Sequence, residues 1–74
     1  MNLYLISQTV NKDYDTYDSA VVCAVDGQQA KKIHPGNSAI KATWCHPKDV
    51  TVKYLGKADQ LLDQGIICAS FNAG

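Results

Sequence analysis

The chain contains four short apolar segments, none of which is long enough for a helix of ordinary length. They span 3–7, 19–25, 50–55 and 66–71, so each holds five to seven residues. The segment 19–25 is apolar on both alternating faces, and 50–55 alternates between apolar and polar residues. Such runs, rich in β-branched and aromatic residues, are typical of strands. Together they predict a sheet of four strands.

One short helix is expected between the second and third strands. Asp26 can cap its first turn, and Gln29 stands in the position of a capping-box partner. Ala30 and Ile33 fall on one face of the helix. Because Pro35 disfavours a helical conformation in the residue before it, the helix is expected to end at about Ile33. The predicted element order is therefore ββαββ.

The length of 74 residues allows only one core. A chain of this size buries roughly 60% of the surface that its unfolded form exposes. Residues 1–74 are therefore expected to form a single two-layer α+β domain, a mainly antiparallel sheet with the helix on one face. The connection 56–65 is expected to form a helical turn that places Leu61 and Leu62 on the core, and 39–43 a short structured stretch.

The net charge is zero, because seven Lys balance seven Asp, and Arg and Glu are absent. This balance argues against a nucleic-acid partner, general or sequence-specific. The charges are unevenly distributed: −3 over 1–26, +5 over 27–57 and −2 over 58–74. The basic middle could face an acidic partner or a phosphorylated ligand; alternatively, its lysines are separately solvated. Without Arg, the bidentate contact that phosphate recognition favours is missing.

The cysteines and the apolar runs predict a cytoplasmic protein with reduced thiols. Cys23, Cys45 and Cys68 form an odd set without CxxC spacing, unlike the even sets of small secreted domains. No run approaches the ~18 apolar residues of a membrane span, and residues 1–6 lack the pattern of a signal peptide. Cys23 and Cys68 lie within strands, where a free Cys is usually a small buried hydrophobe.

Metal binding and catalysis are not expected. His34, Cys45 and His46, with the two strand cysteines, lack the spacing of a structural zinc site. The adjacent side chains of Cys45 and His46 tend to diverge, and nothing suggests a set of oxyanion donors. The sequence therefore predicts a protein that is not an enzyme, with no metal and no cofactor.

The polar segment 8–18 is the leading candidate for a binding site. At about eleven residues it exceeds the ~2–5 of an ordinary hairpin loop, and it places Tyr14 and Tyr17 among Asp13, Asp15 and Asp18. Tyrosine offers a stiff, amphipathic contact surface. Alternatively, the Asp side chains bond local backbone in turns while the rings cover the sheet edge. A calcium loop is a poor match, because the Gly at position six and the Glu at position twelve are missing.

Three further residues complete the candidate set. Trp44 is either a lid on the core or an exposed ring that stacks on a base or contacts a partner. His34 precedes Pro35, and Asn72 begins the tail 72–74, which should fray unless it docks. The candidate partner- or ligand-binding residues are thus Tyr14, Asp15, Tyr17, Asp18, His34, Trp44 and Asn72.

Two segments of the sequence are distinctive, Tyr-Asp-Thr-Tyr-Asp-Ser at 14–19 and Ala-Ser-Phe-Asn-Ala-Gly at 69–74. In these segments most specifically, and over nearly its whole length, the chain resembles a group of small, mostly uncharacterised proteins encoded in phages, prophages and bacterial genomes. The resemblance implies a phage context, in which proteins of this size are frequently inhibitors of host systems, including anti-CRISPR and other anti-defence factors. The helix departs from the group, since 27–32 has lysines where related sequences carry Glu and Arg.

Two main functional hypotheses follow; a third, a small enzyme or a structural module, is disfavoured by the absence of a catalytic arrangement in the sequence. The first is a non-enzymatic phage-type protein in the cytoplasm of a bacterial host, which inhibits a host defence complex by protein–protein contact. The alternative is an oligomeric sponge that sequesters a nucleotide signal, with Trp44, Tyr14 or Tyr17 stacking on the base and Lys binding phosphate. A sponge of this size would almost require a dimer, so a homodimer is possible.

Overall fold

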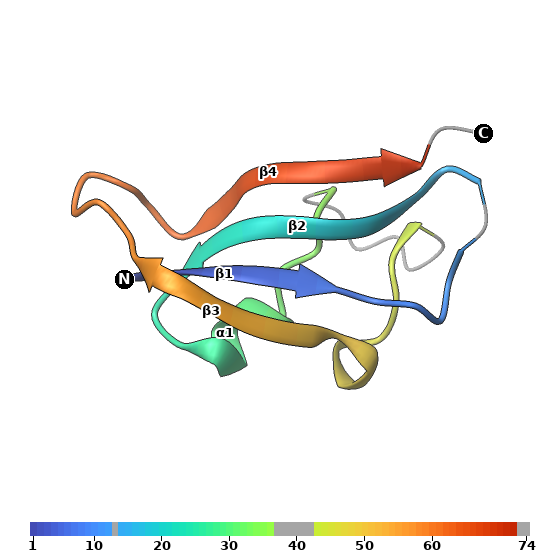
Figure 1. The fold of residues 1–74 in the computed structure, drawn as a ribbon, viewed down its shortest axis with the longest axis horizontal. Helices are drawn as coiled ribbons and strands as arrows, with labels where there is room; N and C mark the ends of the chain where they lie inside the picture. Colours follow the sequence, from blue (N-terminus) through green and yellow to red (C-terminus); the bar gives the residue numbers. More distant parts are fainter. Residues whose placement is uncertain (13, 37–42, 73–74) are drawn as a thin grey trace.

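The computed structural model describes residues 1–12, 14–36 and 43–72, and it confirms the α+β fold in ββαββ order. Two strands precede the helix and two follow it, with a short 3-10 helix, η2, before the third strand (Figure 1). The elements are β1 (Asn2–Ser7), β2 (Thr16–Ala24), α1 (Gly27–Lys31), η2 (Pro47–Asp49), β3 (Thr51–Lys57) and β4 (Gly65–Asn72).

The four strands form one antiparallel sheet in the order β3-β1-β2-β4 (Figure 1). The hairpin strands β1 and β2 therefore lie in the middle, and β3 and β4 at opposite edges. The regular residue-by-residue pairing is interrupted once between β1 and β3 and twice between β2 and β4. These irregularities lie beside Tyr4, Asp18 and Val22.

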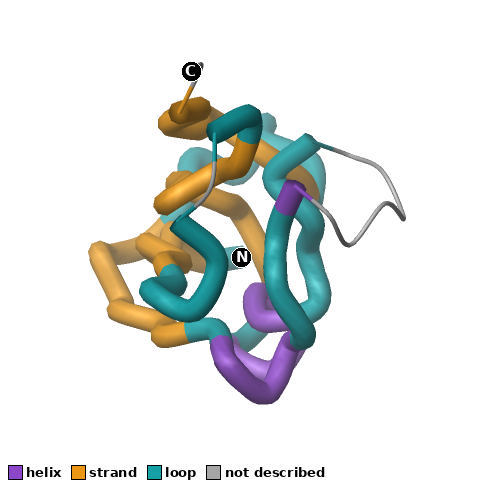
Figure 2. The backbone as a smooth tube through the Cα atoms, turned by 90° about the vertical axis from the view of Figure 1, so that its right-hand side faces the viewer, coloured by secondary structure: helices purple, strands orange, loops and turns teal. Residues whose placement is uncertain are grey.

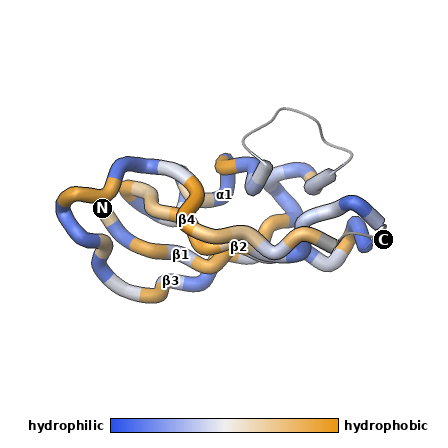
Figure 3. Tube along the Cα trace, turned by 90° about the horizontal axis from the view of Figure 1, so that it is seen from above, coloured by the Kyte–Doolittle hydropathy of each residue, from blue (hydrophilic) through white to orange (hydrophobic). Residues whose placement is uncertain are grey.

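One face of the sheet carries the core. Strand pairing sets Ile6 beside Ala20, and Tyr4 beside Val22, and all four side chains are buried. Helix α1 and the connection after it cover this face, contributing Ala30, Trp44 and Val50 to the core. Figures 2 and 3 show this second layer on one side of the sheet, and none of the described segments crosses the other side.

Helix α1 begins as its sequence predicts and ends earlier. The Asp26 carboxylate accepts a hydrogen bond from the Gln29 backbone N–H at 2.9 Å, which caps the first turn. The last turn then changes to a 3-10 pattern, because the backbone N–H groups of Lys32 and Ile33 donate to the carbonyls three residues before them. This 3-10 geometry ends the helix at Lys31, two residues before the expected Ile33. Ile33 still packs against the core, from the connection.

The expectation that Leu61 and Leu62 reach the core is wrong. Their side chains are 86% and 37% exposed. Because β3 and β4 lie at opposite edges, the segment 58–64 must pass beyond the ends of the two central strands (Figure 1). Asp59 organises the turn there, since its carboxylate and its carbonyl accept from the Leu61 and Leu62 N–H groups.

The start of the second strand and the burial of one cysteine also differ from what the sequence predicts. Strand β2 begins at Thr16, so the connection from β1 spans 8–15 rather than 8–18. Cys23 is buried as expected, but Cys68 is exposed because it lies on the uncovered face of an edge strand. The stretch expected at 39–43 lies, apart from Thr43, outside the described residues.

Among the residues described, no helix has the length and apolar character that crossing a membrane requires. The protein is a small compact domain with a radius of gyration of 11.6 Å.

Candidate functional site

The β1–β2 loop, residues 8–15, is held by the side chain of Gln8. This side chain follows Tyr4 and Ile6 on the core face and is only 5% exposed. Its Nε2 donates to the carbonyls of Asn11 and Tyr17 at 2.7 and 2.9 Å, and its Oε1 accepts from the Asn11 N–H at 2.7 Å. One buried amide therefore ties both arms of the loop together.

A second contact fixes the loop to the layer behind the sheet. The Asn11 side-chain amide donates to the Trp44 carbonyl at 3.0 Å, across 33 positions of sequence. The Gln8 backbone N–H also donates to the carbonyl of Asp18, the third residue of β2, at 3.2 Å. The loop is therefore attached at its start, at Asn11 and at its return into the sheet.

The far end of this loop presents Tyr14 and Asp15 to solvent. Tyr14 is 76% exposed, one of the most exposed large apolar side chains of the described chain. Asp15 has a φ of 61°, which is the left-handed conformation that Asp tolerates in turns. Asp18 is also exposed, and its carboxylate accepts from the Ser19 hydroxyl at 3.0 Å. An aromatic ring and two carboxylates are thus exposed at one end of the sheet.

Tyr17 has a different role from Tyr14, because its ring lies in an aromatic cluster. The ring centroid is 4.8 Å from that of Phe71 and 6.2 Å from that of His34, both in edge-to-face geometry. Gly36 lies directly beside the Tyr17 ring, and a Cβ there would come within 3.0 Å of Tyr17 Cε2. The cluster joins β2, β4 and the connection after α1.

His34 is held in place by two hydrogen bonds at its ring nitrogens. Nδ1 accepts from the Gly36 N–H at 2.9 Å, and Nε2 lies 3.2 Å from the Thr43 hydroxyl. Since Nδ1 is the acceptor, the proton of the neutral ring is on Nε2. His34 therefore closes the turn at 34–36 and packs against Tyr17.

Trp44 lies in the core and is 4% exposed, as the lid alternative predicts. Its ring offers no open face for stacking in this conformation. Its Nε1 finds no acceptor among the residues described. Asn72 ends β4 with its backbone paired to Thr16, so this residue extends the sheet.

The structure thus gathers the predicted residues at one end of the sheet but divides their roles. Tyr14, Asp15 and Asp18 are exposed, whereas Trp44 is buried and the rings of Tyr17 and His34 pack against each other. Gln8 and Asn11 lie within the predicted segment 8–18, but neither was among the individual candidate binding residues. The alternation of Tyr4, Ile6 and Gln8 could have placed Gln8 on the core face, but nothing in the sequence shows what it bonds.

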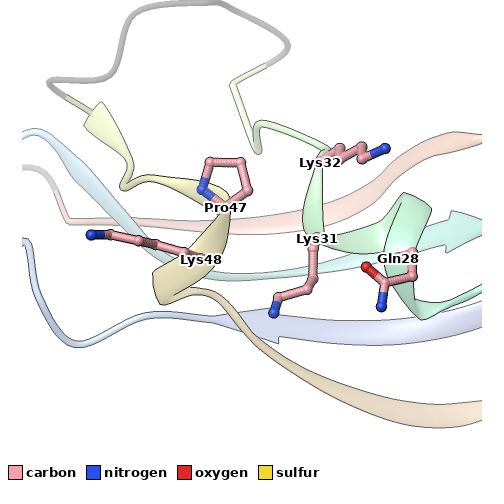
Figure 4. Close-up of a pocket in the computed structure, with 5 residues that line it drawn as sticks. All are labelled: Gln28, Lys31, Lys32, Pro47 and Lys48. Atoms are coloured by element: carbon pink, nitrogen blue, oxygen red, sulfur yellow. The ribbon is translucent and has the colours of Figure 1, made fainter.

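Three lysines of the basic middle segment meet elsewhere, at an open pocket of about 200 Å³ between α1 and η2. Lys31 and Lys32 come from the end of the helix, and Lys48 from η2, whose first turn is capped by the His46 side chain. Figure 4 shows the ammonium groups of these lysines directed away from one another. The pocket is lined by Gln28, Lys31, Lys32, Pro47 and Lys48.

The cysteine and histidine side chains form no group of three metal ligands anywhere in the described ranges. Burial raises the pKa of the Cys45 thiol, and the nearby Asp49 carboxylate raises it further. A raised pKa lowers the fraction of thiolate, which is the nucleophilic form. Cys45 is therefore a poor nucleophile at neutral pH.

Comparison of the chain with protein-family models, with curated proteins and with solved structures finds no match.

Proposed function

We propose that the protein is a non-enzymatic binding protein that inhibits a host complex by occupying a protein surface, and that Tyr14 is its main contact residue. The observation that carries the proposal is the combination of an exposed tip with a fixed base. Tyr14 is 76% exposed, while Gln8 and Asn11 hold the loop by four side-chain hydrogen bonds. A loop whose base is already fixed by hydrogen bonds loses less entropy on binding.

The chemistry of the loop suggests the kind of surface that it contacts. A tyrosine ring fits an apolar pocket and can donate a hydrogen bond from its hydroxyl. Asp15 and Asp18 add two exposed carboxylates near the ring in sequence, so the partner surface should carry Lys or Arg around that pocket. The resemblance to phage-encoded proteins suggests that this partner belongs to a bacterial defence complex.

The test is capture of the partner from a lysate of the bacterial host, followed by affinity measurements with Tyr14→Ala. A central tyrosine contact contributes about 2 kcal/mol or more, so the variant should bind roughly 30-fold more weakly. Tyr54→Ala is the matched control, because Tyr54 is 56% exposed on the edge strand β3. Equal affinities of the Tyr14 and Tyr54 variants would contradict the assignment.

A second function, sequestration of a nucleotide, is favoured by the three lysines at the α1–η2 pocket. The buried position of Trp44 and the diverging lysines of Figure 4 weigh against a preformed site for base and phosphate. Calorimetry against cyclic and linear nucleotides distinguishes the two functions. Tight binding without turnover, lost in Lys31→Gln, would support sequestration, whereas no binding across the panel would exclude it.

A further inference from the structure

The two edges of the sheet differ in how well they are protected against pairing with a further strand. Strands β3 and β4 each have a hydrogen-bonded neighbour on one side only, and Figure 1 shows no described strand beyond either of them. The backbone N–H and C=O groups on the outer side of such a strand are a template for pairing with another chain. Lysine, proline and β-bulges at an edge are the devices by which proteins block that pairing.

Strand β3 carries two of these devices. Lys53 and Lys57 lie within the strand, and the register with β1 passes from Tyr54 to Gly56, so that Leu55 is an extra, bulged residue. The lysines repel a second cationic strand, and the bulge interrupts the row of outward backbone groups. The β3 edge is therefore protected.

Strand β4 lacks these devices over its last part. The strand Gly65–Asn72 contains no charged residue and no proline. Its one extra residue is Ile67, which the register with β2 skips. At the other irregularity the extra residue, Asp18, belongs to β2, so β4 runs without interruption over 68–72. This stretch is an unprotected edge.

The side chains of the unprotected edge suit the addition of a strand. Ala69 and Phe71 lie on the core side of the sheet, opposite Ala20 and Tyr17 of β2, whereas Ser70 is exposed on the uncovered side. Phe71 remains 45% exposed, although its ring packs on Tyr17. Helix α1 packs mainly against β1, β2 and β3, so the helical layer lies away from this edge. An exposed apolar ring thus stands beside outward backbone groups that have no strand partner among the described residues.

We infer that β4 is a dimerisation edge, which pairs antiparallel with β4 of a second copy over residues 68–72. The two-fold axis then passes through the Ser70 pair, perpendicular to the sheet, so that both helical layers lie on the same side of one continuous sheet. A second copy is the matching occupant because it brings the same uncharged edge, whereas a β3 edge would bring its lysines. The inference does not depend on the proposed binding role of Tyr14.

The register about this axis is self-complementary. Phe71 of each copy comes opposite Ala69 of the other on the core side, where the small methyl group leaves room for the exposed ring. On the uncovered side, the two Ser70 side chains face each other. Pairing over 68–72 allows about four to six backbone hydrogen bonds. An interface of this extent belongs to the small, weak class, so we expect a Kd of about 0.1 mM.

The pairing is tested by sedimentation equilibrium over a range of concentrations. The mass of the wild-type chain should rise from its monomer value of 8.0 kDa toward twice that value. Ser70→Lys places two cations directly opposite each other and should weaken the dimer about fivefold or more, and Ser70→Asp should do the same with two anions. An equimolar mixture of the two variants should dimerise about as tightly as the wild type, because each introduced cation then meets an anion.

Thr51→Lys is the matched control for the Ser70 variants. The registers place Thr51 in the same cross-strand row as Ser70, exposed on the uncovered side of the other edge strand, β3. This variant adds the same charge to the same face of the sheet, but away from the proposed interface. It should therefore dimerise like the wild type.

Each variant is first shown to be folded by the fluorescence of Trp44, which is buried in the core on the other side of the sheet. A wild-type chain that stays monomeric at about 0.5 mM would overturn the inference, since a dimer with a Kd of about 0.1 mM is largely formed at that concentration. So would a Ser70→Lys variant that dimerises as tightly as Thr51→Lys, because the interface would then lie elsewhere. A mixture of the Ser70 variants that dimerises no more tightly than either variant alone would contradict the two-fold pairing through Ser70.

Discussion

Replacing Gln8 by methionine should destabilise the protein more than any other change of a polar residue in the loop. Methionine has a similar length, so it can occupy the space of the buried side chain. It cannot replace the three hydrogen bonds that the Gln8 amide makes to Asn11 and Tyr17. The backbone groups of these two residues would then lose their partners.

The magnitude follows from the number and burial of these bonds. Each contributes about 0.5–1.5 kcal/mol net, and a half-buried loop allows water to replace part of the loss. We expect the free energy of unfolding to fall by about 2–3 kcal/mol. The total free energy of unfolding of a domain of this size is roughly 4–11 kcal/mol. A loss of this size should lower the Tm by about 10–20 °C.

The assay is urea unfolding followed by the fluorescence of Trp44, the single tryptophan, which is 4% exposed. Gln28→Met is the matched control, because Gln28 is exposed on α1 and glutamine and methionine have similar helix propensities. The control should change the free energy of unfolding by less than about 0.5 kcal/mol. If Gln8→Met unfolds at the same urea concentration as Gln28→Met, the loop is not held by the Gln8 amide.

Three further changes test the core, the aromatic cluster and the half-buried Cys45 thiol. Ile6→Ala should lower the free energy of unfolding, measured in urea, by about 2–5 kcal/mol, because the Ile6 side chain is fully buried. Leu61→Ala, at an exposed position, should lower it by less than about 0.5 kcal/mol. Gly36→Ala should cost about 1–3 kcal/mol, because its Cβ would press on the Tyr17 ring at 3.0 Å; a silent substitution would show that the ring moves freely. Burial and the Asp49 carboxylate raise the pKa of the Cys45 thiol, so its alkylation near pH 8 should be slower than that of the exposed Cys68. The rate of alkylation of Cys45 should increase with pH. The variant Asp49→Asn should increase this rate, and an unchanged rate would exclude an effect of Asp49.

The fold was predictable because its signals are local. The alternation in 50–55, the apolar run at 19–25 and the Asp26 cap each specify one element from neighbouring residues. The order of the strands in the sheet was not predictable in the same way. It depends on which edges β3 and β4 join, and the same placement explains why Leu61 and Leu62 lie in solvent rather than on the core.

The candidate site was predicted in outline only. Tyrosine and aspartate at 14–18 mark a polar, aromatic loop, but sequence cannot separate the exposed Tyr14 from Tyr17, whose ring packs on Phe71. That difference arises from contacts between residues more than fifty positions apart. The fixing of the loop through Asn11 and the Trp44 carbonyl is equally non-local.

Protection of backbone amides from hydrogen exchange in the captured complex tests most directly whether the β1–β2 loop is the binding surface. The proposed function predicts that amides around Tyr14 and Asp15 exchange more slowly in the complex than in the free protein, because the partner covers the exposed loop tip. Protection at the α1–η2 pocket, with no change in the loop, would contradict it.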